Sequence, residues 1–158
     1  MAWLSDQSGY SYRLLSEGRW EYARRSITKI ARSDGAPEPV ADEDQPEVGN
    51  VKGENWTAAT TAVGSYRSNK FLLYDMMGNA GEWTLDCWQD DHSKQPKSGE
   101  AVKGTGDCTA RAVRGGSWDE PTSRARPASR RKMPADTRDW RIGFRVMREI
   151  ATGGQAEQ

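Results

Sequence analysis

Seven tryptophans and sixteen glycines are spread through this sequence, although only 35% of its residues are hydrophobic. Such a composition predicts a core made of a few large aromatic side chains and a backbone that turns often. We therefore expect short regular elements and a high proportion of loops. At 158 residues the chain fits one compact domain that buries roughly two thirds of its unfolded surface.

The charged residues balance, with 23 Lys and Arg against 23 Asp and Glu. The chain therefore has no net positive charge that would attract it to nucleic acid or to an acidic membrane. Any binding must depend on a local group of residues. No stretch approaches the roughly 20 apolar residues that cross a bilayer. Residues 1–9 also lack the basic flank and apolar run of a secretion signal. We expect no nucleic-acid partner and no membrane span.

Helical signals gather near the start of the chain. Ser16 is a good N-cap, and apolar residues follow at helical spacing, namely Trp20, Ala23, Ile27 and Ile30. This predicts an amphipathic helix, preceded by a strand end at 11–14. Residues 2–4 resemble the last turn of an earlier helix.

The rest of the chain predicts loops and short strands. Residues 33–61 are rich in Pro, Gly, Asp and Glu, which indicates a long surface loop. The polar residues 151–158 are expected to form a flexible tail after a domain at 1–150. Strands are predicted by short apolar runs between glycine turns, at Leu72 to Asp75, Gly81 to Asp86, Ala112 to Gly116 and Ile142 to Arg148.

Two cysteines, Cys87 and Cys108, bracket a polar, glycine-bearing loop. A disulfide would fasten the two ends of that loop and would place the protein in the periplasm or outside the cell. The alternative is a pair of reduced, half-buried thiols, as in a cytosolic protein.

Four segments in this order resemble the formylglycine-generating enzyme (sulfatase-modifying factor) family. They are Tyr12-Arg-Leu-Leu-Ser-Glu-Gly-Arg-Trp-Glu-Tyr-Ala-Arg, Leu73-Tyr-Asp-Met-Met-Gly-Asn-Ala-Gly-Glu-Trp, Val113-Arg-Gly-Gly-Ser-Trp and Ile142-Gly-Phe-Arg-Val. The resemblance implies an α+β, C-type-lectin-like fold, rich in loops, with short strands and one or two helices.

Family members begin with further strands and a helix ahead of the position of Trp3. The domain at 1–150 is therefore expected to be truncated at its N-terminus, and its closing strand to have an open edge. That edge could recruit a second copy or a separate N-terminal segment.

Asp75 and Glu82 are two carboxylates seven residues apart with a glycine turn between them. Hard oxygen donors in a flexible arrangement suit calcium. The resemblance implies that the Asp75 and Glu82 side chains bind calcium together with the carbonyls of Gly78 and Ala80. The alternative is that the two carboxylates only accept backbone hydrogen bonds in turns. A second family calcium site would correspond to Asn50, Val51 and Asn55, where a solvated loop is the alternative.

The resemblance also bears on catalysis. The family's oxidase holds copper with two thiolates, two and seven residues after the aromatic of the Gly-Gly-Ser-aromatic motif. Counted from Trp118, these positions are Glu120 and Ala125, which carry no sulfur. Formylglycine generation is therefore not expected. In an iron-dependent branch of the family, histidines of a separate helical domain hold the iron. This sequence has one histidine, His92, in a polar loop, so that mechanism is not expected from this chain alone.

Arginines crowd the last third of the chain beside two tryptophans. Arg124, Arg126, Trp118 and Trp140 are candidates for binding a protein, a peptide or a small anionic ligand. The alternative is that the arginines pair internally with acidic residues.

Two functions remain open at this point. The first is a noncatalytic, calcium-stabilised binding or scaffold domain. The second is an oxidoreductase of the same family without catalytic cysteines, in which Glu120 acts as a general base. The sequence does not name the ligand.

Overall fold

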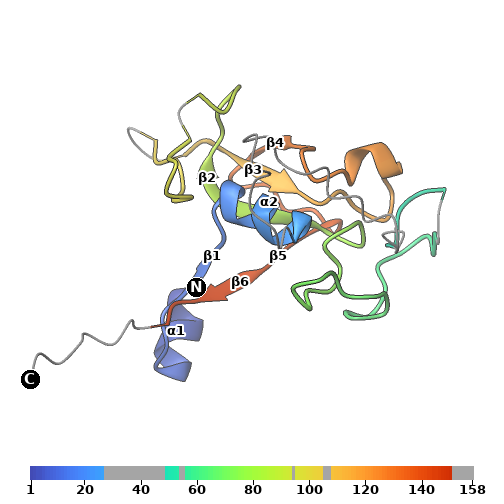
Figure 1. Ribbon diagram of the computed structural model, residues 1–158, viewed down its shortest axis with the longest axis horizontal. Coiled ribbons are helices and arrows are strands. Elements are labelled where there is room, and N and C mark those ends of the chain that lie inside the picture. The colour runs from blue at the N-terminus through green and yellow to red at the C-terminus, as the bar shows by residue number, and fades with distance from the viewer. Residues whose placement is uncertain (27–48, 54–55, 94, 105–107, 151–158) are drawn as a thin grey trace, which may run out of the picture.

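The computed structural model describes residues 1–26, 49–53, 56–93, 95–104 and 108–150. Figure 1 shows a body of short strands and long loops, with the helix α2 (Glu17–Arg25) across β2 (Gly81–Cys87) and β3 (Ala110–Arg114). A smaller ribbon leaves this body and ends at the helix α1 (Ala2–Ser8). The α+β, loop-rich architecture agrees with the expectation from the sequence.

The strands of the described residues form two separate sheets. The larger sheet has the order β4-β3-β2-β5, in which β4 (Arg131–Pro134) and β3 are antiparallel to their neighbours. The strand β5 (Ile142–Phe144) is parallel to β2. The smaller sheet pairs β1 (Tyr12–Leu14) with β6 (Val146–Arg148) in antiparallel register.

The structure corrects three of the strand predictions. The predicted strand at 142–148 is broken at Arg145, where the chain passes from the larger sheet into the smaller one. The segment 72–75 is not a strand, because Leu72 and Asp75 both have left-handed backbones, with φ of 59° and 55°. The strand predicted to begin at 112 instead occupies 110–114, where β3 is paired on both sides.

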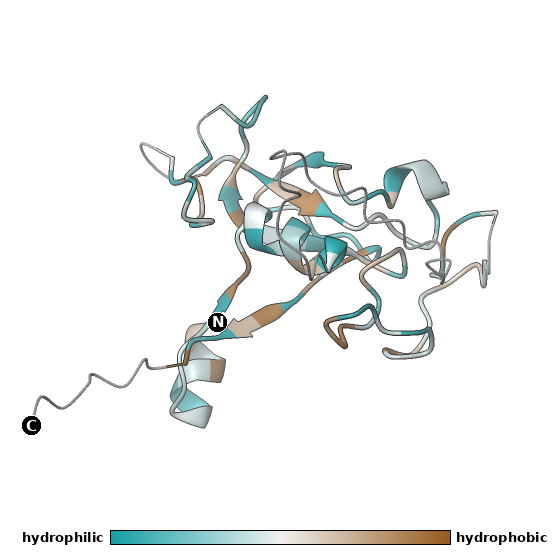
Figure 2. Ribbon diagram, viewed as in Figure 1, coloured by the Kyte–Doolittle hydropathy of each residue, from teal (hydrophilic) through white to brown (hydrophobic). Residues whose placement is uncertain are grey.

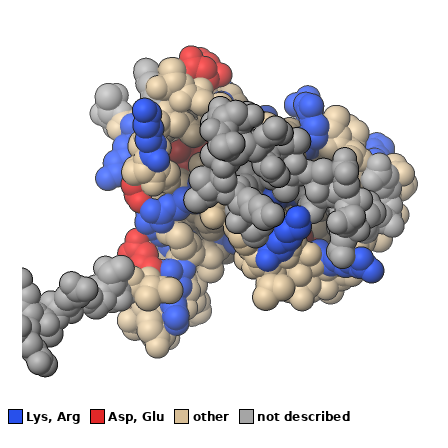
Figure 3. All heavy atoms as spheres, in the orientation of Figure 1, with Lys and Arg blue, Asp and Glu red and all other residues tan. Residues whose placement is uncertain are grey.

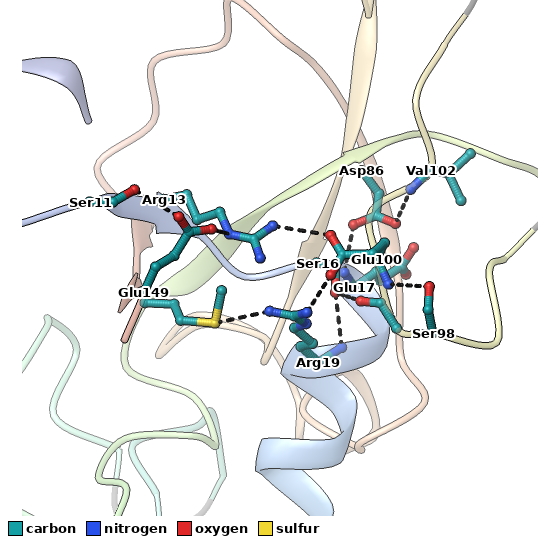
Figure 4. Close-up of polar contacts among 12 residues, drawn as sticks. Ser11, Arg13, Ser16, Glu17, Arg19, Asp86, Ser98, Glu100, Val102 and Glu149 are labelled. Atoms are coloured by element: carbon teal, nitrogen blue, oxygen red, sulfur yellow. Dashed lines mark hydrogen bonds and ion pairs between the residues drawn. The ribbon is translucent and has the colours of Figure 1, made fainter. Parts of the chain in front are cut away.

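The helix α2 begins where its sequence predicts. The Ser16 side chain accepts a hydrogen bond from the Arg19 amide at 3.2 Å, and the Glu17 amide donates to Asp86 at 2.6 Å. Figure 4 shows the Asp86 carboxylate also accepting from Val102, so the start of α2 is fastened to β2. Burial raises the pKa of this carboxyl. The helix ends at Arg25, and the expected positions Ile27 and Ile30 lie outside the described residues.

Among the described residues, the buried core includes two small hydrophobic clusters. Trp20, on α2, packs with Leu15, Ala23 and Met76 in the first cluster. Val51, Met77 and Ala125 form the second. Figure 2 shows hydrophobic positions spread over short stretches of several strands and loops. Because Met76 and Met77 are adjacent in sequence, the turn that contains them joins the two clusters.

Candidate functional site

The turn from Asp75 to Glu82 has an unusual backbone. Gly78 and Asn79 follow Asp75 in the left-handed region, with φ of 71° and 61°. A side chain at Gly78 would place its Cβ 2.2 Å from the Asn50 carbonyl oxygen, so only glycine fits there. The Gly78 amide donates to the Gly115 carbonyl at 2.9 Å, and the Asn79 amide donates to that of Asn50 at 2.9 Å. The turn is thus anchored to two neighbouring loops.

Asp75 has one satisfied and one unsatisfied carboxylate oxygen. Its Oδ2 accepts a hydrogen bond from the Gly64 amide at 2.7 Å. Its Oδ1 is buried, and no described residue donates to it. A buried carboxylate oxygen without a partner is costly. This atom therefore fits the expectation of a cation at Asp75.

Glu82 is held from two sides. It lies on β2 with 7% of its surface exposed, and its Oε2 accepts from the Trp20 indole nitrogen at 2.7 Å. The Arg145 Nε lies 3.2 and 3.1 Å from its two oxygens, and Arg145 Nη2 lies 2.7 Å from Oε1. The same Nη2 donates to the Tyr74 carbonyl at 2.8 Å. Arg145 thus already compensates the charge of Glu82.

Three of the four predicted calcium ligands, Asp75, Ala80 and Glu82, line one open cavity of about 580 Å³. Gly78 is not among the lining residues. Apolar side chains surround this cavity and are largely exposed: Val63 at 89%, Leu72 at 76% and Phe144 at 63%. No cluster of three or more His, Cys, Asp and Glu side chains occurs in the described part of the chain. An ion here would take its remaining oxygens from main-chain carbonyls and water.

The described side chains of the second predicted calcium site already have partners within the protein. Asn50 is fully buried and donates to Thr57 Oγ1 at 3.0 Å and to the Ala59 carbonyl at 2.7 Å. Val51 belongs to the second hydrophobic cluster. Asn55 lies outside the described residues. A calcium ion at this loop stays a prediction.

The positions that replace the family's thiolates are occupied by an ion pair and a core residue. Glu120 Oε1 lies 3.0 Å from Arg131 Nη1, and its Oε2 accepts from the Ser117 hydroxyl at 3.1 Å. Ala125 is buried in the second hydrophobic cluster. The two cysteines are bonded to each other, with Cys87 at the end of β2 and a Cα separation of 5.2 Å to Cys108. The predicted disulfide is thus present, consistent with an oxidising compartment.

The arginines of the last third pair mainly within the protein. Arg130, Arg131, Arg141 and Arg145 each contact a carboxylate, on Glu17, Glu120, Asp139 and Glu82 respectively. The hydrogen bond from Arg141 lowers the pKa of Asp139 to about 2. Figure 3 shows Lys and Arg on the visible face as several separate groups, some of them next to Asp or Glu, and not as one continuous patch.

The four candidate ligand-binding residues differ in exposure. Trp118 is buried, and its ring lies 5.0 Å from that of Trp140, which is 70% exposed. Arg124 and Arg126 are both exposed, at the end of the 3-10 helix η1 (Thr122–Arg124) and just beyond it. His92 is exposed in a loop.

The sequence did not reveal the partners of Glu82. Trp20 lies 62 residues before it and Arg145 lies 63 residues after it. Both residues belong to the quoted motifs, but a motif does not say which side chains meet. In the described part of the chain, no helix is long and apolar enough to span a bilayer.

Comparisons with known proteins give the same family. The sulfatase-modifying factor enzyme 1-like domain model matches residues 1–150. The chain is 29% identical to the formylglycine-generating enzyme of Mycobacterium tuberculosis, over 89% of this chain and 52% of that protein. It is 30% identical to a serine/threonine-protein kinase, pkn1 of Chlamydia pneumoniae, over 90% of this chain and 22% of the kinase.

Among solved structures, PvdO from Pseudomonas aeruginosa superposes with a TM-score of 0.78 and 35% identity, over 94% of this chain and 57% of that chain. The chain thus spans about half the length of the formylglycine-generating enzyme and a smaller part of the kinase. With the family model matching nearly its whole length, the chain belongs to the formylglycine-generating enzyme (sulfatase-modifying factor) family.

Proposed function

We propose that this chain is a calcium-stabilised, noncatalytic binding or scaffold domain of its family. The observation that carries the proposal is the buried, unpartnered Oδ1 of Asp75, a residue that lines the same cavity as Glu82 and Ala80. Carboxylate and carbonyl oxygens are the donors that calcium prefers. The Asp75 and Glu82 side chains would hold the ion, with the carbonyls of Gly78 and Ala80.

A structural role for the ion follows from the position of the turn. Met76 packs in the first hydrophobic cluster and Met77 in the second, directly after Asp75. A cation at Asp75 would neutralise a partly unsatisfied carboxylate that directly precedes the residues joining the two clusters. Binding to the folded state alone stabilises it by mass action.

The noncatalytic part of the proposal rests on the residues at the family's copper position. Glu120 and Ala125 supply no thiolate, and the two cysteines of the sequence form a disulfide with each other. Soft sulfur ligands are what cuprous copper requires. Both oxygens of Glu120 are held, by Arg131 and Ser117, so Glu120 acts as a structural partner and not as a free general base.

The surface near η1 is the proposed contact region for a protein, a peptide or a small anion. Arg124 and Arg126 are exposed there, and the exposed ring of Trp140 packs against Trp118. The disulfide supports a periplasmic or extracellular location. The strand β6 pairs with β1, and no other described strand pairs with it, so self-association through its second edge is part of the proposal.

Metal analysis combined with an oxygen-uptake assay tests this function. The purified protein should contain calcium and negligible copper or iron, and should not consume oxygen with peptide thiols. The variant Asp75→Asn should lose the calcium, whereas Asp136→Asn, at an exposed position, should retain it. Oxygen uptake with a peptide thiol, or a redox metal bound in place of calcium, would overturn the proposal.

A further inference from the structure

Arg145 occupies a junction between three parts of the molecule. It is the single residue between β5 and β6, where the chain leaves the larger sheet for the smaller one. Its guanidinium contacts the Glu82 carboxylate on β2 and the Tyr74 carbonyl in the cavity wall. One side chain therefore links the strand junction, the predicted calcium carboxylate and the rim of the cavity.

The contacts of Arg145 resemble those of a bound metal ion. Its Nη2 bridges a carboxylate oxygen at 2.7 Å and a main-chain carbonyl at 2.8 Å, the two kinds of oxygen that calcium takes from proteins. Glu82 is buried, and both of its oxygens already accept hydrogen bonds from Arg145. A divalent ion that uses the same carboxylate would therefore meet the positive charge of Arg145 beside it.

We propose, on the basis of the calcium site described above, that Arg145 is a resident cation that competes with calcium for Glu82. Without calcium, Arg145 holds Glu82 and Tyr74 together. When calcium binds, it takes over Glu82, and Arg145 gives up its contacts with Glu82 and the Tyr74 carbonyl. Calcium binding thereby changes the contacts at the cavity rim and at the β5–β6 junction.

The groups that Arg145 would release, Glu82 and the Tyr74 carbonyl, belong to residues that line the cavity. Tyr74 is adjacent to Asp75 and close to the exposed Leu72, which also lines the cavity. Arg145 lies next to Phe144, another exposed lining residue. The apolar rim is thus joined to the strand junction by a contact that a cation can break, and calcium would alter the shape of this surface.

Calcium titration calorimetry on three proteins tests the competition. Arg145→Gln removes the resident charge, and Arg148→Gln is the matched control because Arg148 lies on β6 and stacks on Tyr10. We expect Arg145→Gln to bind calcium about tenfold more tightly than the wild type, and Arg148→Gln to bind like the wild type. If Arg145→Gln folds poorly, Arg145→Lys keeps the charge but loses the planar two-point contact, and an affinity between the two is expected.

The release of Arg145 can be measured separately, by nuclear magnetic resonance of its Nε–H group. This signal is assigned as the one that disappears in Arg145→Gln. Calcium should move this signal in the wild type toward the position of solvated arginines, and an unmoved signal would overturn the proposal. Equal or weaker calcium binding by Arg145→Gln would also overturn it, while leaving the calcium site intact. If no variant binds calcium, both the calcium site and the competition are refuted. If Arg145→Gln alone binds calcium, the competition is supported, but calcium binding by the wild type is refuted.

Discussion

Replacing Arg114 by methionine removes the most deeply buried cation of the described structure. Its side chain is fully buried, forms ion pairs with Glu17 and Glu21, and donates to the Ser129 carbonyl at 2.9 Å. The guanidinium also lies 5.4 Å from the centre of the Trp20 ring. Methionine keeps much of the apolar volume, so the substitution isolates the charge and its hydrogen bonds.

The expected loss follows from what remains behind. Removing one partner of a buried ion pair costs about 3–5 kcal/mol, because the other charge stays buried. Glu17 keeps its contacts with Arg130, which places the Arg114→Met loss near the lower end, at about 3 kcal/mol. For a chain of this size, that loss corresponds to a fall in Tm of about 6 to 12 °C.

Urea denaturation at pH 7, followed by tryptophan fluorescence, measures this loss directly. Arg148→Met is the control, since Arg148 is exposed and its guanidinium stacks on Tyr10, and it should cost at most about 1 kcal/mol. A loss below about 1 kcal/mol for Arg114→Met would refute the reasoning, because it would mean that Glu17 and Glu21 do not depend on Arg114 for their burial.

Three further predictions concern stability. Reducing the Cys87–Cys108 bond, which spans 21 residues, should lower the free energy of unfolding by about 3 kcal/mol, measured by urea melts with and without a reductant. The pKa of Asp139 is lowered from 3.8 to about 2 by its hydrogen bond from Arg141, so its stabilising contribution is present above about pH 4 and is lost toward pH 2. The Tm difference between the wild type and Asp139→Asn should therefore shrink as the pH falls through this range, and a constant difference would count against it. Ala125→Leu should cost about 1–3 kcal/mol in urea melts, because Ala125 is buried against Gly116 and the second cluster.

The parts of the fold that could be predicted depend on local chemistry. Ser16 signals the start of a helix because its hydroxyl can accept a backbone hydrogen bond three residues on, and it does so. The disulfide could be anticipated from two cysteines around one polar loop. The α+β class followed from four motifs in one order, and the family model agrees with it.

Other features depend on contacts between distant residues. The segment 72–75 has the apolar content of a strand, but Leu73 alone packs against the first cluster while Leu72 and Tyr74 stay exposed at the cavity rim. The sequence did not predict the strand β4, because it begins with the charged pair Arg131 and Lys132 and ends at a proline, and its pairing with β3 decides its structure. The contact of Arg145 with Glu82 joins residues 63 positions apart, which no local pattern encodes.

Calcium-dependent melting tests the central claim most directly. The Tm of the wild type should rise with added calcium and fall after chelation, with a stabilisation of about 2.7 kcal/mol when calcium is at 100 times its Kd. Asp75→Asn should melt at the same temperature in calcium and in chelator, since it lacks the carboxylate whose Oδ1 is unpartnered. Identical wild-type melting curves in calcium and in chelator would contradict the assignment of this domain as calcium-stabilised.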